Sequence, residues 1–154
     1  MKTLLKLAAI SLLAATATQA LAADKIKIGT EGAYPPFNSM TADGKVVGFD
    51  VDIANALCAQ MKAECEIVTQ DWDGIIPGLI AKKYDAIIAS MSITDERKQQ
   101  VDFTNPYYKS ALTFVAKAGS GVTDVAADTL KGKTVGAQAG TTQADFVTAA
   151  FPDV

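Results

Sequence analysis

Apolar residues recur along this chain with two periods, one typical of strands and one of helices. Residues 25–29 alternate polar and apolar side chains, as a half-buried strand does, whereas Ile53, Leu57 and Met61 recur at helical spacing with Ala54 and Cys58 on the same stripe. A turn is expected at 41–45. Further strands are predicted at 66–69, 85–89, 111–116 and 134–137, and helices at 50–61, 72–82, 94–101, 124–130 and 142–151. This alternation indicates α/β layers around a largely parallel sheet.

The first 22 residues have the composition of a cleaved export signal. Lys2 and Lys6 precede an apolar stretch over 4–17 that is too short to span a bilayer, and 20–22 gives a small-x-small cleavage pattern. No later segment is long and apolar enough to cross a membrane. We therefore expect a protein released into the periplasm, without direct membrane insertion.

Charge and residue usage exclude several classes of function. The net charge of −3 becomes −5 when the signal is removed, because two lysines and no acid leave with it, and this argues against a nucleic-acid partner. The chain has no histidine, so we expect no His-based catalysis, and we expect no metal and no cofactor. Cys58 and Cys65 favour a local disulfide in an exported protein, with two free buried thiols as the alternative.

Polar and aromatic residues follow four of the predicted strands. In a parallel α/β sheet, ligands bind beyond the carboxyl ends of the strands, so these residues are expected to meet at one edge. Together they describe a site for a small molecule with a charged end. The residues, strand by strand, are Glu31 and Tyr34, then Asp71 and Trp72, then Ser90 and Ser92, and last Gly140, Thr141 and Thr142.

Arg97 is the only arginine beside thirteen lysines. Its planar guanidinium can grip a carboxylate through two parallel hydrogen bonds, which a lysine cannot do. It follows two hydroxyl residues and a predicted helix start at the end of an apolar strand. This setting favours a carboxylate anchor over an arginine on a solvated helix face.

Three ordered motifs resemble a known family. The segments 48–58, 92–108 and 130–142, which contain Gly-Phe-Asp-Val-Asp, Ser-Ile-Thr-Asp-Glu-Arg and Gly-Thr-Thr, are similar to those of the periplasmic solute-binding proteins of polar amino-acid ABC transporters. The lysine/arginine/ornithine/histidine binders are the most similar branch, with opine binders nearby. The resemblance covers essentially all of the chain after the signal.

The resemblance implies a periplasmic-binding-protein type II fold, in which two α/β lobes joined by a hinge close over an amino acid. The signal would occupy 1–22, the first lobe 23–112 without its closing carboxyl-terminal elements, and the start of the second lobe 113–154. We expect the chain to be the amino-terminal part of a longer protein. The partners implied are the amino acid and an inner-membrane ABC permease, and the expected state is a monomer.

The resemblance also implies roles for individual residues. Arg97 would pair with the ligand α-carboxylate, supported by backbone N–H groups at Ser92 and Thr142, while Ser90 and Ser92 would help hold the α-ammonium. Glu31 would face a distal positive charge, which implies a cationic ligand. The other expected lining residues are Tyr34 and Trp72 around the ligand side chain, Ala89 where related binders often carry a hydroxyl, and Thr141 and Gln143 from the second lobe.

Simpler roles and other functions stay open from the sequence. Tyr34 and Trp72 could be packing residues, Glu31 a solvated charge, and the Ser and Thr residues helix caps. A dehydratase of arogenate or prephenate with this fold would need a general acid, for which Glu31 is the candidate. An amino-acid sensor domain is the third possibility. The expected function is binding without chemistry.

Overall fold

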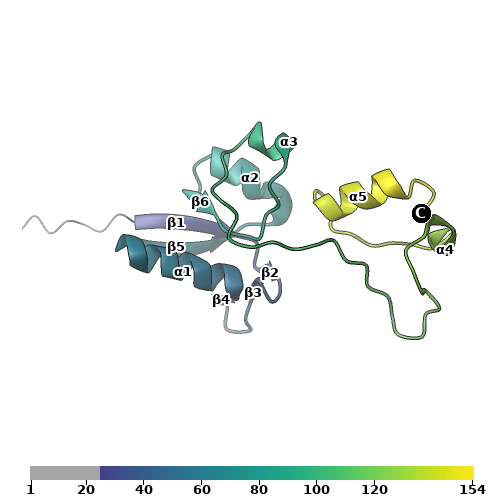
Figure 1. Ribbon diagram of the computed structural model, residues 1–154. Helices are drawn as coiled ribbons and strands as arrows, with labels where there is room; N and C mark the ends of the chain where they lie inside the picture. Colours follow the sequence, from purple (N-terminus) through teal and green to yellow (C-terminus); the bar gives the residue numbers. More distant parts are fainter. Residues whose placement is uncertain (1–24) are drawn as a thin grey trace, which may run out of the picture.

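The computed structural model describes residues 25–154, so the predicted signal peptide lies outside the described residues. Figure 1 shows two parts: all strands lie with the first three helices, and the last two helices lie beyond a long extended segment. We call these the first part and the second part. The α/β class is confirmed, whereas the lobe boundaries at 112 and 113 stay a prediction.

The first part is built on a three-stranded parallel sheet. Its strands are β1 (Lys25–Thr30), β5 (Glu64–Thr69) and β6 (Ala86–Ile87), in the order β5-β1-β6. Ile28 of β1 lies opposite Ile67 of β5 and Ala86 of β6. The central position of β1 places its carboxyl end between the carboxyl ends of its two neighbours.

Helices α1 (Phe49–Met61) and α2 (Trp72–Ile80) cover opposite faces of this sheet, as Figure 1 shows. One core cluster joins Ile28 to Ala54 and Cys58 of α1, and the other joins Ile75 of α2 to Tyr84 and Ala89. Successive strand residues point to opposite faces, which is why one short sheet supports two cores.

The helix at α1 is confirmed, but the apolar stripe predicted for it is only partly buried. Leu57 and Met61 are 50% and 56% exposed. The buried residues of α1 are Ala54 and Cys58, which belong to the predicted stripe, together with Asp50 and Val51. Small side chains let a helix lie close to its sheet, and here close approach decides which face is buried.

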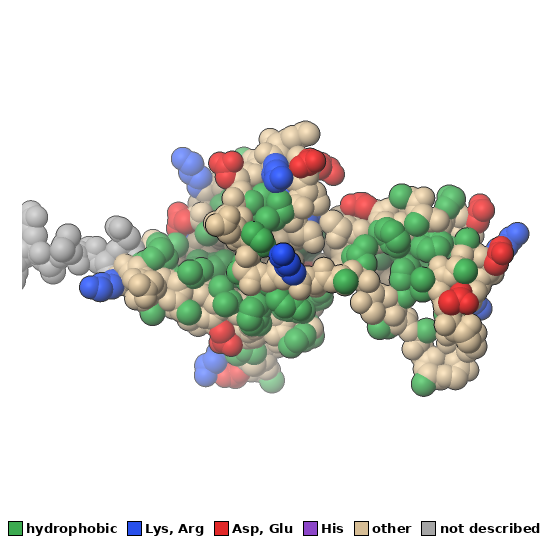
Figure 2. All heavy atoms as spheres, viewed as in Figure 1, with side chains coloured by type: hydrophobic (Ala, Val, Ile, Leu, Met, Phe, Trp, Pro, Cys, Tyr) green, Lys and Arg blue, Asp and Glu red, His purple; other side chains and the backbone are tan. Residues whose placement is uncertain are grey.

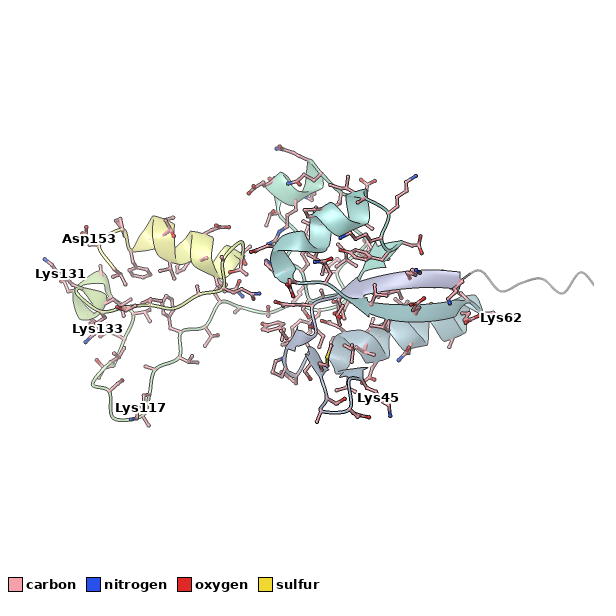
Figure 3. The ribbon with its side chains drawn as sticks, turned by 180° about the vertical axis from the view of Figure 1, so that it is seen from behind. Lys45, Lys62, Lys117, Lys131, Lys133 and Asp153 are labelled. Carbon is pink, nitrogen blue, oxygen red and sulfur yellow. A yellow bond between two sulfur atoms is a disulfide. The ribbon has the colours of Figure 1, made fainter. Side chains whose placement is uncertain are left out.

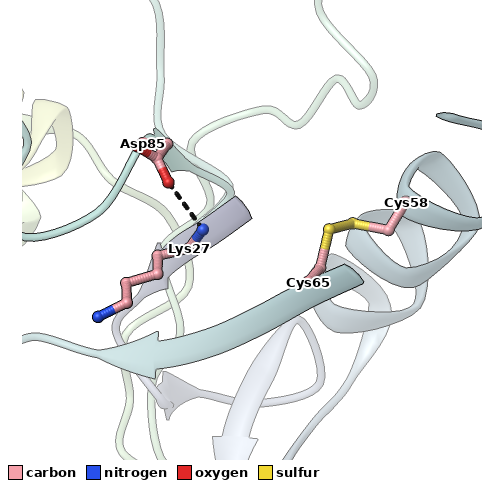
Figure 4. Close-up of a disulfide and its surroundings, with 4 residues drawn as sticks. All are labelled: Lys27, Cys58, Cys65 and Asp85. Carbon is pink, nitrogen blue, oxygen red and sulfur yellow. Dashed lines mark hydrogen bonds between the residues drawn. A yellow bond between two sulfur atoms is a disulfide. The ribbon is translucent and has the colours of Figure 1, made fainter. Parts of the chain in front are cut away.

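The predicted disulfide is confirmed. Cys58 near the end of α1 is bonded to Cys65 on β5, as Figure 4 shows. The bond closes a short loop around the left-handed C-cap at Lys62. It ties the helix to the edge strand of the sheet.

The side chain of Tyr84 belongs to the second core cluster and lies against two glycines. A Cβ atom added to Gly29 of β1 would lie 2.8 Å from the Tyr84 ring, and one added to Gly78 of α2 would collide with its hydroxyl oxygen. The hydroxyl itself donates to the carbonyl of Ile75. β1 and α2 can therefore lie this close to the ring only because both positions are glycines, which have no side chain.

A second, antiparallel sheet was not predicted. It is formed by β2 (Ala33–Tyr34), β3 (Asn38–Met40) and β4 (Val46–Val47), in that order. The predicted turn at 41–45 connects β3 to β4, where the Thr41 carbonyl accepts from the Gly44 N–H. Strands this short do not extend far enough for a period-of-two pattern to reveal them.

The second part contains α4 (Ala127–Leu130) and α5 (Thr142–Ala150), while α3 (Asp95–Lys98) belongs to the first part. The strands predicted at 111–116 and 134–137 are wrong, because neither segment pairs with a strand within residues 25–154. A strand is defined by its ladder, so an apolar pattern alone does not form one. Phe114, Phe146 and Phe151 pack edge to face between these segments and α5.

Candidate functional site

The carboxyl ends of the three parallel strands lie at one edge of the sheet, as predicted for them, whereas the fourth predicted strand end is missing because 134–137 is not a strand. Glu31 follows the last residue of β1, Trp72 opens α2 just after β5, and Ala89 and Ser90 follow β6. All ten residues expected to contact a ligand line one cavity of about 1010 Å³, whereas Asp71 and Gly140, which were expected at the same edge, do not line it. The ten lining residues are Glu31, Tyr34, Trp72, Ala89, Ser90, Ser92, Arg97, Thr141, Thr142 and Gln143. Their contact with a ligand stays a prediction.

The cavity lies between the two parts of the chain. One wall comes from the strand ends of the first part, and the other from segments 110–125 and 133–147. Hydrophobic side chains gather over the second part in Figure 2. The lining of the second wall includes Phe114 and Phe146. The volume is at the upper end of ordinary ligand pockets because it includes this apolar surface.

Arg97 projects into the cavity from the short helix α3. Thr94 caps this helix by accepting from the Arg97 N–H at 3.2 Å. The guanidinium Nη1 donates to the Ser92 carbonyl at 2.8 Å, and its carbon lies 5.4 Å from the Trp72 ring centre. Burial lowers the pKa of Arg97 from its ordinary value, with Asp145 and Glu96 acting in the opposite direction. Even so, an arginine stays charged at neutral pH, so the cavity contains a fixed cation.

Three hydrogen bonds join the two parts across the cavity. Arg97 Nη2 and Trp72 Nε1 both donate to the carbonyl of Gly140, at 3.0 and 2.9 Å. Gln138 Nε2 donates to the Glu31 carboxylate at 2.5 Å. The groups predicted to hold a ligand thus contact the loop that precedes α5.

The hydroxyl groups of the site have different partners. Thr141 is the N-cap of α5: its hydroxyl accepts from the Ala144 N–H at 3.2 Å and donates to the Gln138 carbonyl at 2.6 Å. The cap interpretation is therefore correct for Thr141, which also lines the cavity. Ser90 donates its hydroxyl hydrogen to Asp50 at 2.8 Å, and Ser90 has a left-handed backbone with φ of 49°.

Among the residues near the site that were missed from the sequence, four lie close to the predicted binding groups. Phe37 and Tyr108 line the cavity, with Phe37 stacked on Tyr34 at 5.0 Å and 5.1 Å from Tyr108. Gln138 also lines it, and Asp50 lies behind Ser90. The sequence carried one signal, an aspartate on the same face of α1 as Ala54 and Cys58. Tyr108 packs against Phe37 and Phe49 and also lines the cavity.

Several lysines lie away from the strand ends, whereas Lys117 and Lys133 line the cavity on the side of the second part. Figure 3 places Lys45, Lys62 and Lys131 at the outer margins of the molecule, away from the middle where the two parts meet. The three salt bridges of the described residues are exposed pairs: Lys25–Glu66, Lys45–Asp43 and Lys98–Asp95. Such pairs contribute little to stability. No helix within residues 25–154 is long and apolar enough to cross a membrane.

Residues 26–149 match the model of the bacterial extracellular solute-binding proteins, family 3. The chain belongs to this family. A curated relative from Pseudomonas aeruginosa, named as an L-arginine-binding protein, is 54% identical over 129 residues, which cover 83% of this chain and 49% of the relative. The chain thus spans about half the length of that relative.

Solved structures of the same family match the fold. A Salmonella typhimurium periplasmic binding protein, whose structure is described as the basis for high arginine specificity, has a TM-score of 0.71 and 41% identity over 82% of this chain and 55% of that one. The type II fold is therefore confirmed. An ancestral amino-acid-binding protein, described as a precursor of cyclohexadienyl dehydratase, has a TM-score of 0.78 and 34% identity over 84% of this chain and 58% of that one. The proteins similar to this chain thus include both a periplasmic binding protein and a precursor of an enzyme.

Proposed function

We propose that the complete protein is a periplasmic binding protein that captures a cationic L-amino acid of the arginine type between two lobes. The observation that carries the proposal is that Arg97 and Glu31, which have opposite charges, line one cavity beside the rings of Tyr34 and Trp72. The other charged lining residues, Lys117, Asp124 and Lys133, come from the wall formed by the second part. A zwitterion with an extra positive side chain complements this arrangement, because its carboxylate fits Arg97 and its distal cation fits Glu31.

The remaining roles follow from the same geometry. Thr142 opens α5, so its backbone N–H is free of the helix ladder and suited to a carboxylate, as we propose also for the N–H of Ser92. Ser90 and Ser92 would accept from the α-ammonium, Gln143 and Thr141 would form the opposite wall, and Ala89 would leave room for the ligand. The lobes would be 23–112 and a second lobe that begins at 113.

Closure of the two lobes would present the loaded protein to an inner-membrane ABC permease. The three hydrogen bonds across the cavity support this, because they show that the second part can contact the binding groups directly. Release from the membrane would follow cleavage of residues 1–22. We propose that the protein acts as a monomer and performs no chemistry.

A thermal-shift panel on the complete mature protein tests the proposal. It would include arginine, ornithine, lysine, histidine, glutamine, glutamate, octopine and prephenate. A ligand at a hundredfold excess over its Kd stabilises the folded state by about 2.7 kcal/mol, which raises the melting midpoint. A shift with arginine or ornithine alone supports a cationic ligand. A shift with glutamine or glutamate alone would reject the role of Glu31, and turnover of prephenate without any amino-acid shift would reject the binding function.

A further inference from the structure

The carboxylate of Asp50 lies at the centre of a buried hydrogen-bond network behind the cavity. Asp50 is the second residue of α1 and is fully buried, at 0% exposure. Its Oδ2 accepts from Asn38 Nδ2 at 2.7 Å, and its Oδ1 accepts from Ser90 Oγ and from Tyr107 Oη, both at 2.8 Å. The donors come from β3, from the segment after β6 and from the segment that leads to the second part.

This buried carboxylate has no cationic partner among residues 25–154, because none of the ion pairs there involves Asp50. Burial of an ionised group is costly, and hydrogen bonds from neutral donors offset only part of that cost. A neutral residue could link the same three segments at a lower desolvation cost. The negative charge therefore suggests a use beyond tethering the segments.

Ser90 connects this charge to the cavity. Its N–H donates to Tyr107 Oη at 2.8 Å and its hydroxyl hydrogen goes to Asp50, so both of its hydrogens are directed away from the cavity that it lines. What remains available is the oxygen of the hydroxyl, with free acceptor capacity. A hydroxyl that donates to a carboxylate becomes a stronger acceptor, because bonds in a chain polarise one another.

A group that suits such an acceptor must donate hydrogen bonds and carry positive charge. An ammonium has three donors and no acceptor. We propose that Asp50 is a positioning residue for the α-ammonium of the ligand: its charge acts through Ser90 Oγ and selects ligands that carry this group. The inference rests on the proposed function, since it takes the ligand to be an amino acid.

The test is an exchange of charge between two neighbours in the complete protein, Asn38→Asp with Asp50→Asn. The amide introduced at position 50 could still accept from Ser90 and Tyr107, and it would donate to the carboxylate introduced at position 38. That carboxylate would also accept from the Gly32 N–H, which Asn38 Oδ1 now binds at 2.7 Å. Every hydrogen bond is thereby kept, and the charge moves away from Ser90. If the double variant does not fold, the single Asp50→Asn variant takes its place in the experiment.

Two ligands distinguish a role of Asp50 in recognising the α-ammonium from a purely structural role. Arginine has the α-ammonium, and 5-guanidinopentanoate lacks it but keeps the carboxylate and the guanidinium. We expect the exchange to weaken arginine binding about tenfold in calorimetry, as for loss of a charge-assisted hydrogen bond, and to change binding of the deaminated probe less than about twofold. A further expectation is that in a Ser90→Ala background the exchange has no additional effect on arginine.

Equal weakening of both probes would show that Asp50 is only structural and overturn the inference, as would unchanged binding of both. If the wild-type protein binds neither probe nor any other amino acid, the proposed function fails first. Asp52→Asn is the matched control, because Asp52 lies on the same helix two residues away and is exposed. This control should leave the ratio of the two affinities at its wild-type value.

Discussion

The guanidinium of Arg97 donates to the carbonyl oxygen of Gly140 at 3.0 Å and so joins the two parts of the chain. A second donor, Trp72 Nε1, reaches the same oxygen. In the proposed complex a ligand carboxylate would replace this carbonyl as a partner of Arg97. A charged acceptor binds an arginine more strongly than a neutral one, so the exchange would favour the ligand.

Arg97→Lys tests this exchange. Lysine keeps the charge but lacks the planar fork, so one of the two parallel hydrogen bonds to a carboxylate is lost. We expect the affinity for arginine to fall by about tenfold or more, measured by calorimetry. Lys98→Gln is the control on the same helix, since its ammonium contacts only Asp95 on the surface. An Arg97→Lys protein with wild-type affinity would contradict the anchor role.

Gly78→Ala should destabilise the fold without touching the cavity. The added Cβ would collide with the Tyr84 hydroxyl oxygen inside a packed core. Overpacking of this kind costs about 1–3 kcal/mol in the free energy of unfolding. Urea denaturation measures it, with Gly136→Ala as the comparison because a Cβ there meets nothing within 4 Å. Equal stability of the two variants would refute the steric role of Tyr84.

Local periodicity predicted the parts of the fold that depend on neighbours in sequence. The helix at α1, the strands β1 and β5 and the disulfide all follow from spacing within a short segment. Burial on α1 was less predictable, because it depends on how close the sheet comes. That distance is set by small residues such as Ala54, which carry little hydrophobic signal.

The site was predictable as a set of residues but not as a network. Converging strand ends bring Glu31, Trp72 and Ser90 together by a general rule of parallel sheets. No such rule pairs Glu31 with Gln138, 107 residues away, or Asp50 with Tyr107, 57 residues away. These contacts depend on the path of the chain between the two parts, which periodicity does not encode.

The hydroxyl of Tyr107 should lose its proton at a higher pH than that of an ordinary tyrosine. Burial, together with the Asp50 carboxylate, raises the pKa of Tyr107 to about 12 from an ordinary value of 10. Because the folded pKa is raised, the stability linked to this group is complete below pH 10 and is lost as the pH rises toward 12. Absorbance titration at alkaline pH should show a late tyrosine that disappears in Tyr107→Phe. Burial also raises the pKa of Tyr84, so a second late tyrosine should remain in the variant.

Removal of the disulfide should lower stability and leave binding unchanged. Cys58 and Cys65 join α1 to β5, and neither of them lines the cavity. The double variant Cys58→Ala with Cys65→Ala should lose about 2–3 kcal/mol of unfolding free energy, as expected for a short closed loop. Urea denaturation of the variant, compared with the wild type in its disulfide-bonded form, measures this. A change in ligand affinity with unchanged stability would contradict the structural role.

Glu31→Gln tests how the site distinguishes ligands by their distal charge. Glutamine has nearly the shape of glutamate and still offers an oxygen to Gln138, but it removes the negative charge that faces the cavity. A cationic side chain would lose a charge-assisted hydrogen bond, so the affinity for arginine should fall by about tenfold, whereas any affinity for glutamine should change little. The measurement is the ratio of the two Kd values in the wild-type and variant proteins. Gln99→Glu provides the control, because it places a new carboxylate on the surface at the end of α3, outside the cavity. If the ratio is the same in the wild type and in Glu31→Gln, the distal charge is recognised by another residue, and Glu31 serves only to hold Gln138.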